Sequence, residues 1–299
     1  MAQLCDRVLV DTCSSEHFMD PALNLPPLDV PGLLRAHHLS PQKSLGQNFL
    51  LDQGALRRVA EAAEIQPEDE VLEIGAGLGS LTRVLAQLAA RVVAVELDRH
   101  LLPILEEVLA PQPNVEIVPG DMLELNPADL MRRSGYIVAA NIPYYITSAL
   151  IRHLLEASIH PSRMVLTIQR EVALRICADP GDLSLLALSV QVYGHPSLAA
   201  RIPAGAFYPP PKVDSAVLKI DLYAEPRIPT AQLDTFFLLA KAGFGQKRKT
   251  LRNSLSSGLG WKSDRTATLL NTAGIDPQRR AETLSLDEWN SLTSAYLAE

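Results

Sequence analysis

The sequence predicts an α/β fold in which a parallel sheet carries helices on both faces and is followed by a small all-helical domain. Two observations lead to this prediction. From Asp52 onward, short apolar runs rich in Val and Ile alternate with helical patterns of about 10–15 residues. Beyond the prolines at Pro226 and Pro229, only helical patterns follow.

The expected elements follow from this alternation in chain order. The carboxylate of Asp52 can cap a helix that runs to about Ile65, before Pro67. The expected parallel strands are Val71–Ile74, Arg91–Glu96, Val115–Pro119, Tyr136–Asn141 and Arg163–Gln169. A period-2 pattern predicts a later, antiparallel strand over Val213–Leu222. The expected C-terminal helices include Ala231–Ala242 and Leu286–Leu297. The predicted domains are a sheet domain over 40–224 and a helical domain over 225–299.

The N-terminal region gives few structural signals. Residues 1–39 contain four prolines and little periodicity, so we expect a loosely ordered leader, and Met19 is an alternative start to Met1. Acidic residues interrupt the first apolar stretch, and no apolar run approaches the roughly 18 residues that span a membrane. The three cysteines have no metal-binding or redox spacing. We therefore expect a cytoplasmic, monomeric protein without a metal.

The charge is distributed unevenly along the chain. The whole chain has a formal charge of −7, which by itself argues against a general nucleic-acid binder. Residues 241–280, however, contain nine Lys or Arg and two acids, so this segment carries +7 and the remainder −14. Its densest part predicts an RNA-binding surface formed by Lys247, Arg248, Lys249 and Arg252.

A glycine-rich turn follows the first predicted strand. Gly75, Gly77 and Gly79 form a G-x-G-x-G pattern before a helix, and Glu96 ends the next strand 21 residues after Gly75. A carboxylate there can accept hydrogen bonds from both ribose hydroxyls of an adenosine, which fits either NAD or S-adenosylmethionine. The spacing differs from the G-x-G-x-x-G of dinucleotide folds. Glu73, just before the turn, would repel a pyrophosphate and attract a cationic methionine group, so S-adenosylmethionine is favoured.

Two further motifs follow the third and fourth predicted strands. Asp121 is a candidate acceptor for the adenine amino group of the cofactor, with Met122 against the ring, although an Asp at a strand end is more often a helix cap. Asn141-Ile-Pro-Tyr144 ends the fourth strand. The Asn141 side-chain carbonyl and the Ile142 backbone carbonyl can accept hydrogen bonds from an aromatic amine, and Pro143 adds no competing donor. Tyr144 can stack on an extruded base.

Together with Ser44–Leu50, Phe207–Ser215 and Phe244–Asn253, these motifs resemble the ribosomal RNA adenine dimethyltransferase family over about Gln42 to Leu297. The resemblance is strongest to its bacterial small-subunit branch. It implies a Rossmann-like, S-adenosylmethionine-dependent methyltransferase sheet with a C-terminal helical domain. It also implies dimethylation of two adjacent adenosines in the 3′-terminal hairpin loop of 16S rRNA, within the assembling small subunit.

The resemblance also implies roles for individual residues. The cofactor would be contacted by Asn48, Leu50, Gly75, Gly77, Glu96, Asp121, Met122 and Asn141. Phe207 would help to hold the target base beside Tyr144. Compared with the family pattern, Ile142 replaces a commoner Leu, and the Pro180–Leu186 stretch, near the RNA side in the family, is shorter than usual.

Three alternative functions remain. The first is a 23S rRNA adenine methyltransferase of the macrolide-resistance type, which the basic Phe244–Asn253 stretch and the Pro209–Lys212 loop disfavour. The second is a ribosome-assembly factor without catalysis, which the intact Asn141, Pro143 and Tyr144 disfavour. The third is an NAD-dependent dehydrogenase, for which no proton-transfer histidine stands near a strand end.

Overall fold

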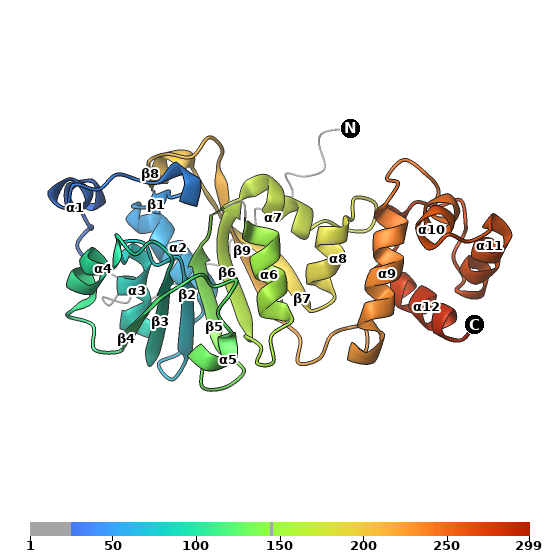
Figure 1. Cartoon of the computed structure of the whole chain (residues 1–299), viewed down its shortest axis with the longest axis horizontal. Coiled ribbons are helices and arrows are strands. Elements are labelled where there is room, and N and C mark those ends of the chain that lie inside the picture. Colours follow the sequence, from blue (N-terminus) through green and yellow to red (C-terminus); the bar gives the residue numbers. More distant parts are fainter. Residues whose placement is uncertain (1–24, 144–145) are drawn as a thin grey trace, which may run out of the picture.

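The computed structural model describes residues 25–143 and 146–299. A seven-stranded sheet with the order β4-β3-β2-β5-β6-β9-β7 forms the centre of the molecule (Figure 1). Its strands are β2 (Glu70–Ile74), β3 (Arg91–Glu96), β4 (Val115–Pro119), β5 (Ile137–Asn141), β6 (Arg163–Gln169), β7 (Gly194–Ile202) and β9 (Ser215–Leu222). The strands β2 to β6 are parallel, and β9 pairs antiparallel with both β6 and β7.

Helices cover both faces of the sheet, as the alternating pattern predicts. The helices of this part are α1 (Val30–Ala36), α2 (Gln53–Ala63), α3 (Ser80–Leu88), α4 (Leu102–Leu109), α5 (Pro127–Leu130), α6 (Thr147–Leu155), α7 (Arg170–Ile176) and α8 (Leu185–Gln191). Neighbouring residues of β2 belong to different cores: Val71 packs with α2 and α3, whereas Leu72 packs with α6. The Asp52 carboxylate accepts a hydrogen bond from the Ala55 N–H and caps α2, which confirms the predicted helix start.

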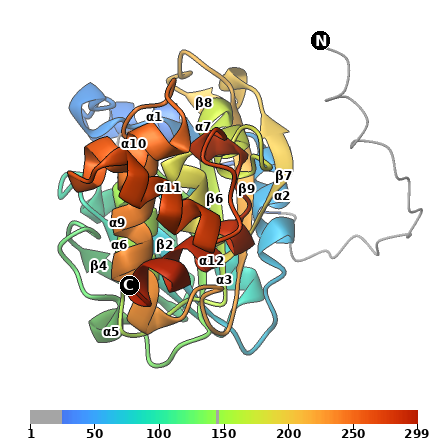
Figure 2. The ribbon, with the colours of Figure 1, turned by 90° about the vertical axis from the view of Figure 1, so that its right-hand side faces the viewer.

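The C-terminal part is helical, as predicted. It consists of α9 (Leu233–Phe244), α10 (Leu251–Leu259), α11 (Ser263–Thr272) and α12 (Leu286–Leu297). These helices lie at one end of the sheet, beside α8 (Figure 1), and cover that end in the perpendicular view (Figure 2). Their core contains the fully buried Trp289 and Phe236 and extends to Leu188 of α8. A Cβ on Gly243 would lie 2.7 Å from the Trp289 ring, so glycine permits this close packing.

Three parts of the structure differ from the sequence prediction. The expected leader is not loosely ordered over Val30–Ala36, because this helix buries Val30 and Leu34 against Leu78 and Ile104. The strand β7 was not predicted, because this edge strand contains Gly, Pro and two Ala and most of its residues are partly or fully exposed. The short antiparallel pair β1 (Phe49–Leu50) and β8 (Phe207–Tyr208) is a third element that the pattern did not reveal.

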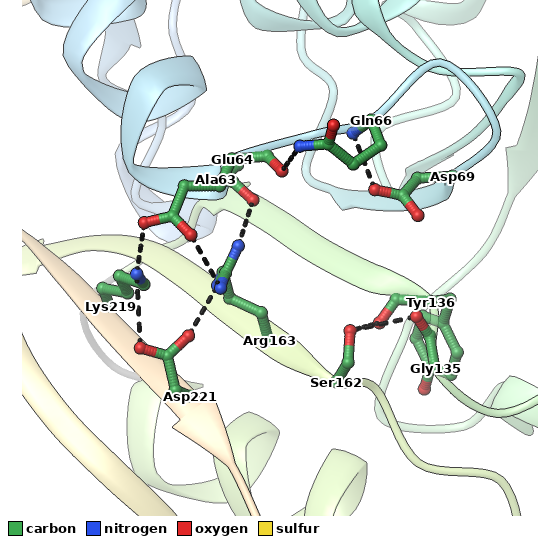
Figure 3. A network of polar contacts seen from close by, with 10 residues as sticks. All are labelled: Ala63, Glu64, Gln66, Asp69, Gly135, Tyr136, Ser162, Arg163, Lys219 and Asp221. Atoms are coloured by element: carbon green, nitrogen blue, oxygen red, sulfur yellow. Dashed lines mark hydrogen bonds and ion pairs between the residues drawn. The ribbon is translucent and has the colours of Figure 1, made fainter.

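Ion pairs join neighbouring segments at the end of the sheet where the parallel strands begin (Figure 3). The Arg163 guanidinium contacts Glu64 at 2.9 Å and Asp221 at 2.6 Å, and it donates a hydrogen bond to the Ala63 carbonyl. Lys219 contacts the same two carboxylates at 2.6 and 3.3 Å. The network therefore connects the end of α2 to β6 and β9. Further along the same edge, Arg91 pairs with Glu70 and Glu116.

Candidate functional site

A cavity of about 200 Å³ opens at the opposite edge, where the parallel strands end. Five segments line it: the turn after β2, the end of β3, the segment after β4, the end of β5, and residues 45–49. Among the described residues that line the cavity, the only charged side chains are those of Glu96 and Asp121. No described helix is long and apolar enough to cross a membrane. No group of three metal-binding side chains occurs within residues 25–143 and 146–299.

The turn after β2 depends on glycine at this edge. Gly75, Gly77 and Gly79 have φ angles of +76°, +60° and +84°, which side chains with a Cβ rarely adopt. A Cβ on Gly77 would also lie 3.1 Å from the Phe49 ring. Both predicted contact residues, Gly75 and Gly77, therefore line the cavity with backbone alone.

Glu96 is buried at the end of β3, with 6% of its surface exposed. Its Oε2 accepts a hydrogen bond from the Gly77 N–H at 2.7 Å, and its Oε1 accepts one from the Asp98 N–H at 2.7 Å. Burial raises the pKa of this carboxyl, and the two backbone hydrogen bonds oppose that shift. Each oxygen has lone pairs beyond these bonds, so the carboxylate can still accept hydroxyl groups of a bound nucleoside.

Glu73 does not have the position that the sequence argument required. Its side chain is 1% exposed, it does not line the cavity, and its Oε2 has no hydrogen-bond partner among the residues that the structure describes. Burial and the nearby negative charge of Glu96 raise its pKa to about 8, so it is mostly neutral at pH 7. Glu73 therefore cannot attract a cofactor as an exposed anion. The negative charge at the cavity comes from Glu96 and Asp121.

Asp121 and Met122 both line the cavity, after β4. The Asp121 Oδ1 accepts a hydrogen bond from the Leu123 N–H at 2.9 Å, so one oxygen stabilises the local turn, in line with the capping interpretation. The second oxygen accepts no hydrogen bond from the described residues and can serve a ligand. Leu97 also lines the cavity and is 43% exposed, although the sequence analysis did not single it out. Its only signal is its place directly after the strand-ending Glu96.

Asn141 ends β5 and lines the cavity together with Ile142 and Pro143. Its Nδ2 donates a hydrogen bond to the Asn48 carbonyl at 2.9 Å. This bond fixes the amide group so that its carbonyl oxygen remains available as an acceptor. Asn48 itself lines the cavity, in agreement with its predicted position. Tyr144, the fourth residue of the motif, lies outside the described residues.

Leu50 and Phe207 lie beside the cavity but do not line it. Their backbones pair across β1 and β8, and the two side chains, 3% and 4% exposed, belong to one buried cluster. Phe49, which does line the cavity, packs in a different cluster, with Leu78 and Ile104. A direct contact of Leu50 with the cofactor, or of Phe207 with a base, remains a prediction.

The predicted basic surface lies in the connection from α9 to α10. Lys247, Arg248 and Lys249 are exposed, and Arg252 is partly exposed. Within the described part of the chain, none of these four side chains forms an ion pair, whereas Arg265, Arg279 and Arg280 pair with Glu299, Glu288 and Glu282. Figure 1 shows this connection at the top, on the side where β1, β8 and α7 lie and the parallel strands end.

Residues 39–298 match the family described as ribosomal RNA adenine dimethylase. The chain is 46% identical over 265 residues to the ribosomal RNA small subunit methyltransferase A of Dehalococcoides mccartyi strain CBDB1, covering 88% of this chain and 91% of that protein. It is 44% identical over 287 residues to the protein of the same name from Pelotomaculum thermopropionicum, covering 91% and 96%.

Two solved structures are similar over most of the chain. The crystal structure of the 23S rRNA methyltransferase ErmE is 30% identical, with a TM-score of 0.68, and covers 83% of this chain and 99% of its own. The crystal structure of a dimethyladenosine transferase from Plasmodium falciparum is 24% identical, with a TM-score of 0.72, and covers 84% and 98%. The second likeness shows the fold, a methyltransferase sheet followed by C-terminal helices, as the sequence predicted.

Proposed function

This chain belongs to the ribosomal RNA adenine dimethylase family, and from this premise we propose that it methylates the exocyclic amine of adenine in small-subunit ribosomal RNA. One observation carries the chemistry: the Asn141 amide is held by the Asn48 carbonyl so that its own oxygen can accept a hydrogen bond at the cavity. The cofactor of this family is S-adenosylmethionine.

The cavity fits this cofactor. Glu96 offers acceptors to ribose hydroxyls, and Asp121 offers one to the adenine amino group. The Gly75–Gly79 turn leaves space that a Cβ would occupy, so backbone can approach the ligand. No Lys or Arg is among the described lining residues, so a pyrophosphate would meet two carboxylates and no cationic side chain, whereas a cationic sulfonium meets net negative charge. We infer that Asn48, Gly75, Gly77, Glu96, Asp121 and Met122 hold the cofactor, with Leu50 behind them.

When bound, S-adenosylmethionine supplies an electrophilic methyl group, and the protein must make a weak nucleophile react. The lone pair of an adenine amine is delocalised into the ring. The Asn141 side-chain oxygen and the Ile142 carbonyl can accept hydrogen bonds from the two N–H groups and favour a tetrahedral nitrogen. Pro143 adds no N–H that would compete for these acceptors. We propose that Tyr144 and Phe207 hold the extruded base. The amine loses its proton after it becomes cationic, so no general base is required.

The relatives support the small subunit as the source of the substrate. Proteins named ribosomal RNA small subunit methyltransferase A are 44–46% identical to this chain, compared with 30% for the 23S enzyme ErmE. We propose that the substrate is the 3′-terminal hairpin loop of 16S rRNA in the assembling small subunit, in the cytoplasm. Both adjacent adenosines would be dimethylated, and the enzyme would act as a monomer.

The C-terminal residues 225–299 are proposed as the RNA-binding domain, with residues 40–224 as the methyltransferase domain. The basic surface of Lys247, Arg248, Lys249 and Arg252 supports this division, because no carboxylate of residues 25–143 and 146–299 forms an ion pair with its cations. Exposed, unpaired cations can replace the counterions of RNA phosphates, which favours binding.

The proposed activity is tested with purified protein, S-adenosylmethionine and small subunits that lack the modification. Primer extension across the 3′-terminal hairpin reports dimethylated adenine, which blocks the polymerase. A stop is expected at the adenosine of the pair that the polymerase reaches first. Methylation of 23S rRNA alone would favour the alternative enzyme, and tight binding to small subunits without methyl transfer would favour an assembly factor.

The RNA-binding surface is tested by replacing Lys247, Arg248 and Lys249 with Ala. RNA affinity should fall, and the slope of log affinity against log salt should decrease by up to about three phosphate contacts. Cofactor affinity should not change, because these residues do not line the cavity. The matched control replaces Arg265 and Arg280, whose charges are already paired. An unchanged salt slope in the triple variant would exclude this surface.

A further inference from the structure

Asp98 lies two residues beyond the end of β3 and is 5% exposed, although it follows the strand at a position where surface residues are common. Its carboxylate accepts hydrogen bonds from three residues. Oδ2 accepts from Gln42 Nε2 at 2.9 Å and from Gln47 Nε2 at 2.7 Å. Oδ1 accepts from the His100 backbone N–H at 3.1 Å and contacts His100 Nδ1 at 2.9 Å.

These bonds close the segment Gln42–Gln47 onto the sheet. The Gln47 side-chain oxygen accepts a hydrogen bond from the Gln42 N–H at 2.7 Å, so the orientation of the Gln47 amide is determined at both ends. The Gln47 N–H donates to the Gln42 carbonyl at 3.3 Å, and Gly46 between them has a φ of +64°. The segment is thus a compact loop, and Asp98 is its anchor on the methyltransferase sheet.

The loop leads directly to the catalytic asparagine. Asn48 follows Gln47, and its carbonyl accepts the hydrogen bond from Asn141 Nδ2 at 2.9 Å. Its side chain donates to the Gly46 carbonyl at 3.0 Å, which ties it to the same loop. The position of the Asn48 carbonyl therefore depends on a loop held by Asp98. If that carbonyl moved away, the Asn141 amide would lose the bond that distinguishes its two ends.

We propose that Asp98 is a positioning residue for methyl transfer: by anchoring the Gln42–Asn48 loop, it keeps the Asn141 amide oriented with its oxygen toward the target amine. This inference rests on the proposed function for its activity readout. Asp98 does not itself line the cavity and acts through the loop that does. Its own backbone N–H holds Glu96 Oε1, and a side-chain substitution leaves that N–H in place. Rates at saturating cofactor therefore separate the orientation of Asn141 from changes in cofactor affinity.

The first test compares Asp98→Ala, Gln47→Ala and the control Asp69→Ala. Asp69 also accepts a backbone hydrogen bond in a turn, from the Gln66 N–H at 2.8 Å, but it lies away from the cavity. Single-turnover methylation should fall roughly 10- to 100-fold in Asp98→Ala and Gln47→Ala, a part of the 10²–10³ expected for complete loss of one such group. Because Gln47 and Asn48 line the cavity, these rates are measured at saturating cofactor, with the affinity for S-adenosylhomocysteine determined in parallel, and Asp69→Ala should match the wild type in both.

The second test asks whether Asp98 acts through Asn141. In an Asn141→Ala background, Asp98→Ala should cause no further loss of rate, because the amide that it orients is absent. If the rate losses of Asp98→Ala and Asn141→Ala multiply in the double variant, Asp98 has a general structural role and the proposal is overturned. A wild-type rate in both Asp98→Ala and Gln47→Ala would also overturn it. If Asp98→Ala does not fold, Gln47→Ala, which breaks the same anchor, takes its place in the double variant.

The third test does not depend on activity. Nuclear magnetic resonance of the full chain identifies the Asn141 side-chain amide by its absence in Asn141→Ala. Hydrogen exchange of that amide should be faster in Asp98→Ala and Gln47→Ala than in the wild type, and unchanged in Asp69→Ala. Unchanged exchange in all three variants would overturn the inference. A wild-type protein that transfers no methyl group would overturn the proposed function instead, while the exchange experiment would still decide the role of Asp98.

Discussion

In the central sheet, acidic residues are used in opposite ways at the amino ends and at the carboxyl ends of the parallel strands. At the amino ends of the strands, Glu64 and Asp221 are paired with Arg163 and Lys219 (Figure 3). At the carboxyl ends, Glu96 and Asp121 accept hydrogen bonds from backbone N–H groups. Within the described residues, neither forms an ion pair with Lys or Arg.

This difference separates stability from function within one sheet. Carboxylates that are matched by cations have little capacity left for a ligand. Carboxylates that accept only backbone N–H groups are not matched by a cation and keep some of their lone pairs for a ligand. The carboxyl edge therefore carries a desolvation cost, visible in the raised pKa of Glu96, and remains ready for a cationic nucleoside ligand. Variants at the two edges should consequently affect different measurements.

The largest effect is expected at the carboxyl edge, for Asn141→Ala. This change removes the side-chain acceptor that acts mainly as the amine becomes tetrahedral, so methyl transfer should slow by roughly 10²–10³-fold. RNA affinity should barely change, because phosphate contacts lie elsewhere. Single-turnover methylation at saturating RNA and cofactor measures this step without binding. A wild-type rate would mean that the catalytic centre is misplaced.

The second-largest effect is expected for a substitution of Glu73, and it concerns stability rather than rate. Its pKa is about 8 in the folded protein, raised from the ordinary glutamate value of 4.5, so the folded state binds more protons than the unfolded state between these values. The free energy of unfolding should therefore fall as pH rises through this window, by at most about 1.4 kcal/mol per pH unit for this group. Glu73→Gln should flatten that dependence.

The free energy of unfolding of the wild type and of Glu73→Gln is measured by urea denaturation from pH 5.5 to 7.5. The difference in this free energy between the two proteins should change by roughly 2–3 kcal/mol over this range. Glu116→Gln is the matched control, because Glu116 is exposed and paired with Arg91 at the amino edge. Parallel pH curves for Glu73→Gln and the wild type would show that Glu73 is ionised in the folded protein. The carboxyl edge would then hold an additional buried anion.

Glu96→Ala should weaken binding of S-adenosylmethionine by roughly 1–3 kcal/mol, the cost of leaving hydroxyl partners unsatisfied. The Gly77 and Asp98 N–H groups also lose their acceptor, but water can enter an open cavity and replace it. Calorimetry with S-adenosylmethionine and with NAD measures the effect and the selectivity together. Tight binding of NAD to the wild type would contradict the cofactor assignment.

The sequence predicted the parallel strands well because they are short Val- and Ile-rich runs separated by helical patterns. The residues Arg91–Glu96 and Val115–Pro119 form strands with the predicted limits. The sequence did not predict α1, which is short and contains a proline, or the edge strand β7. In both places the structure depends on tertiary contacts rather than on a local periodicity.

The site shows the same limit. The motif residues that line the cavity follow strand ends, so the predicted sheet already brings Gly75, Glu96, Asp121 and Asn141 together. Asp98 was not found, because its Gln42 and Gln47 partners lie 56 and 51 residues earlier in the chain. Glu73 was misjudged because a position inside a strand does not reveal whether its side chain faces a ligand or the core.

The smallest effect is expected at the amino edge, for Glu64→Gln. This change removes the anionic partner of both Arg163 and Lys219, while Asp221 still pairs with the two cations. Because the Glu64 side chain is 53% exposed, solvent screens these contacts, and the free energy of unfolding should fall by less than about 1 kcal/mol. The difference should shrink further in 1 M salt.

Methyl transfer by Glu64→Gln should equal that of the wild type, because the network lies at the end of the sheet away from Asn141. Urea denaturation at low and high salt, together with single-turnover methylation, tests both halves of this prediction. Partial burial raises the pKa of Asp221, but hydrogen bonds from Arg163 and Lys219 outweigh this effect and hold the pKa below its usual value. The stabilisation from Asp221 should accordingly persist at neutral pH in Glu64→Gln and disappear as acid protonates the carboxylate. A severalfold loss of methylation in this variant would show that the two edges are coupled, and the separation of stability from function would fail.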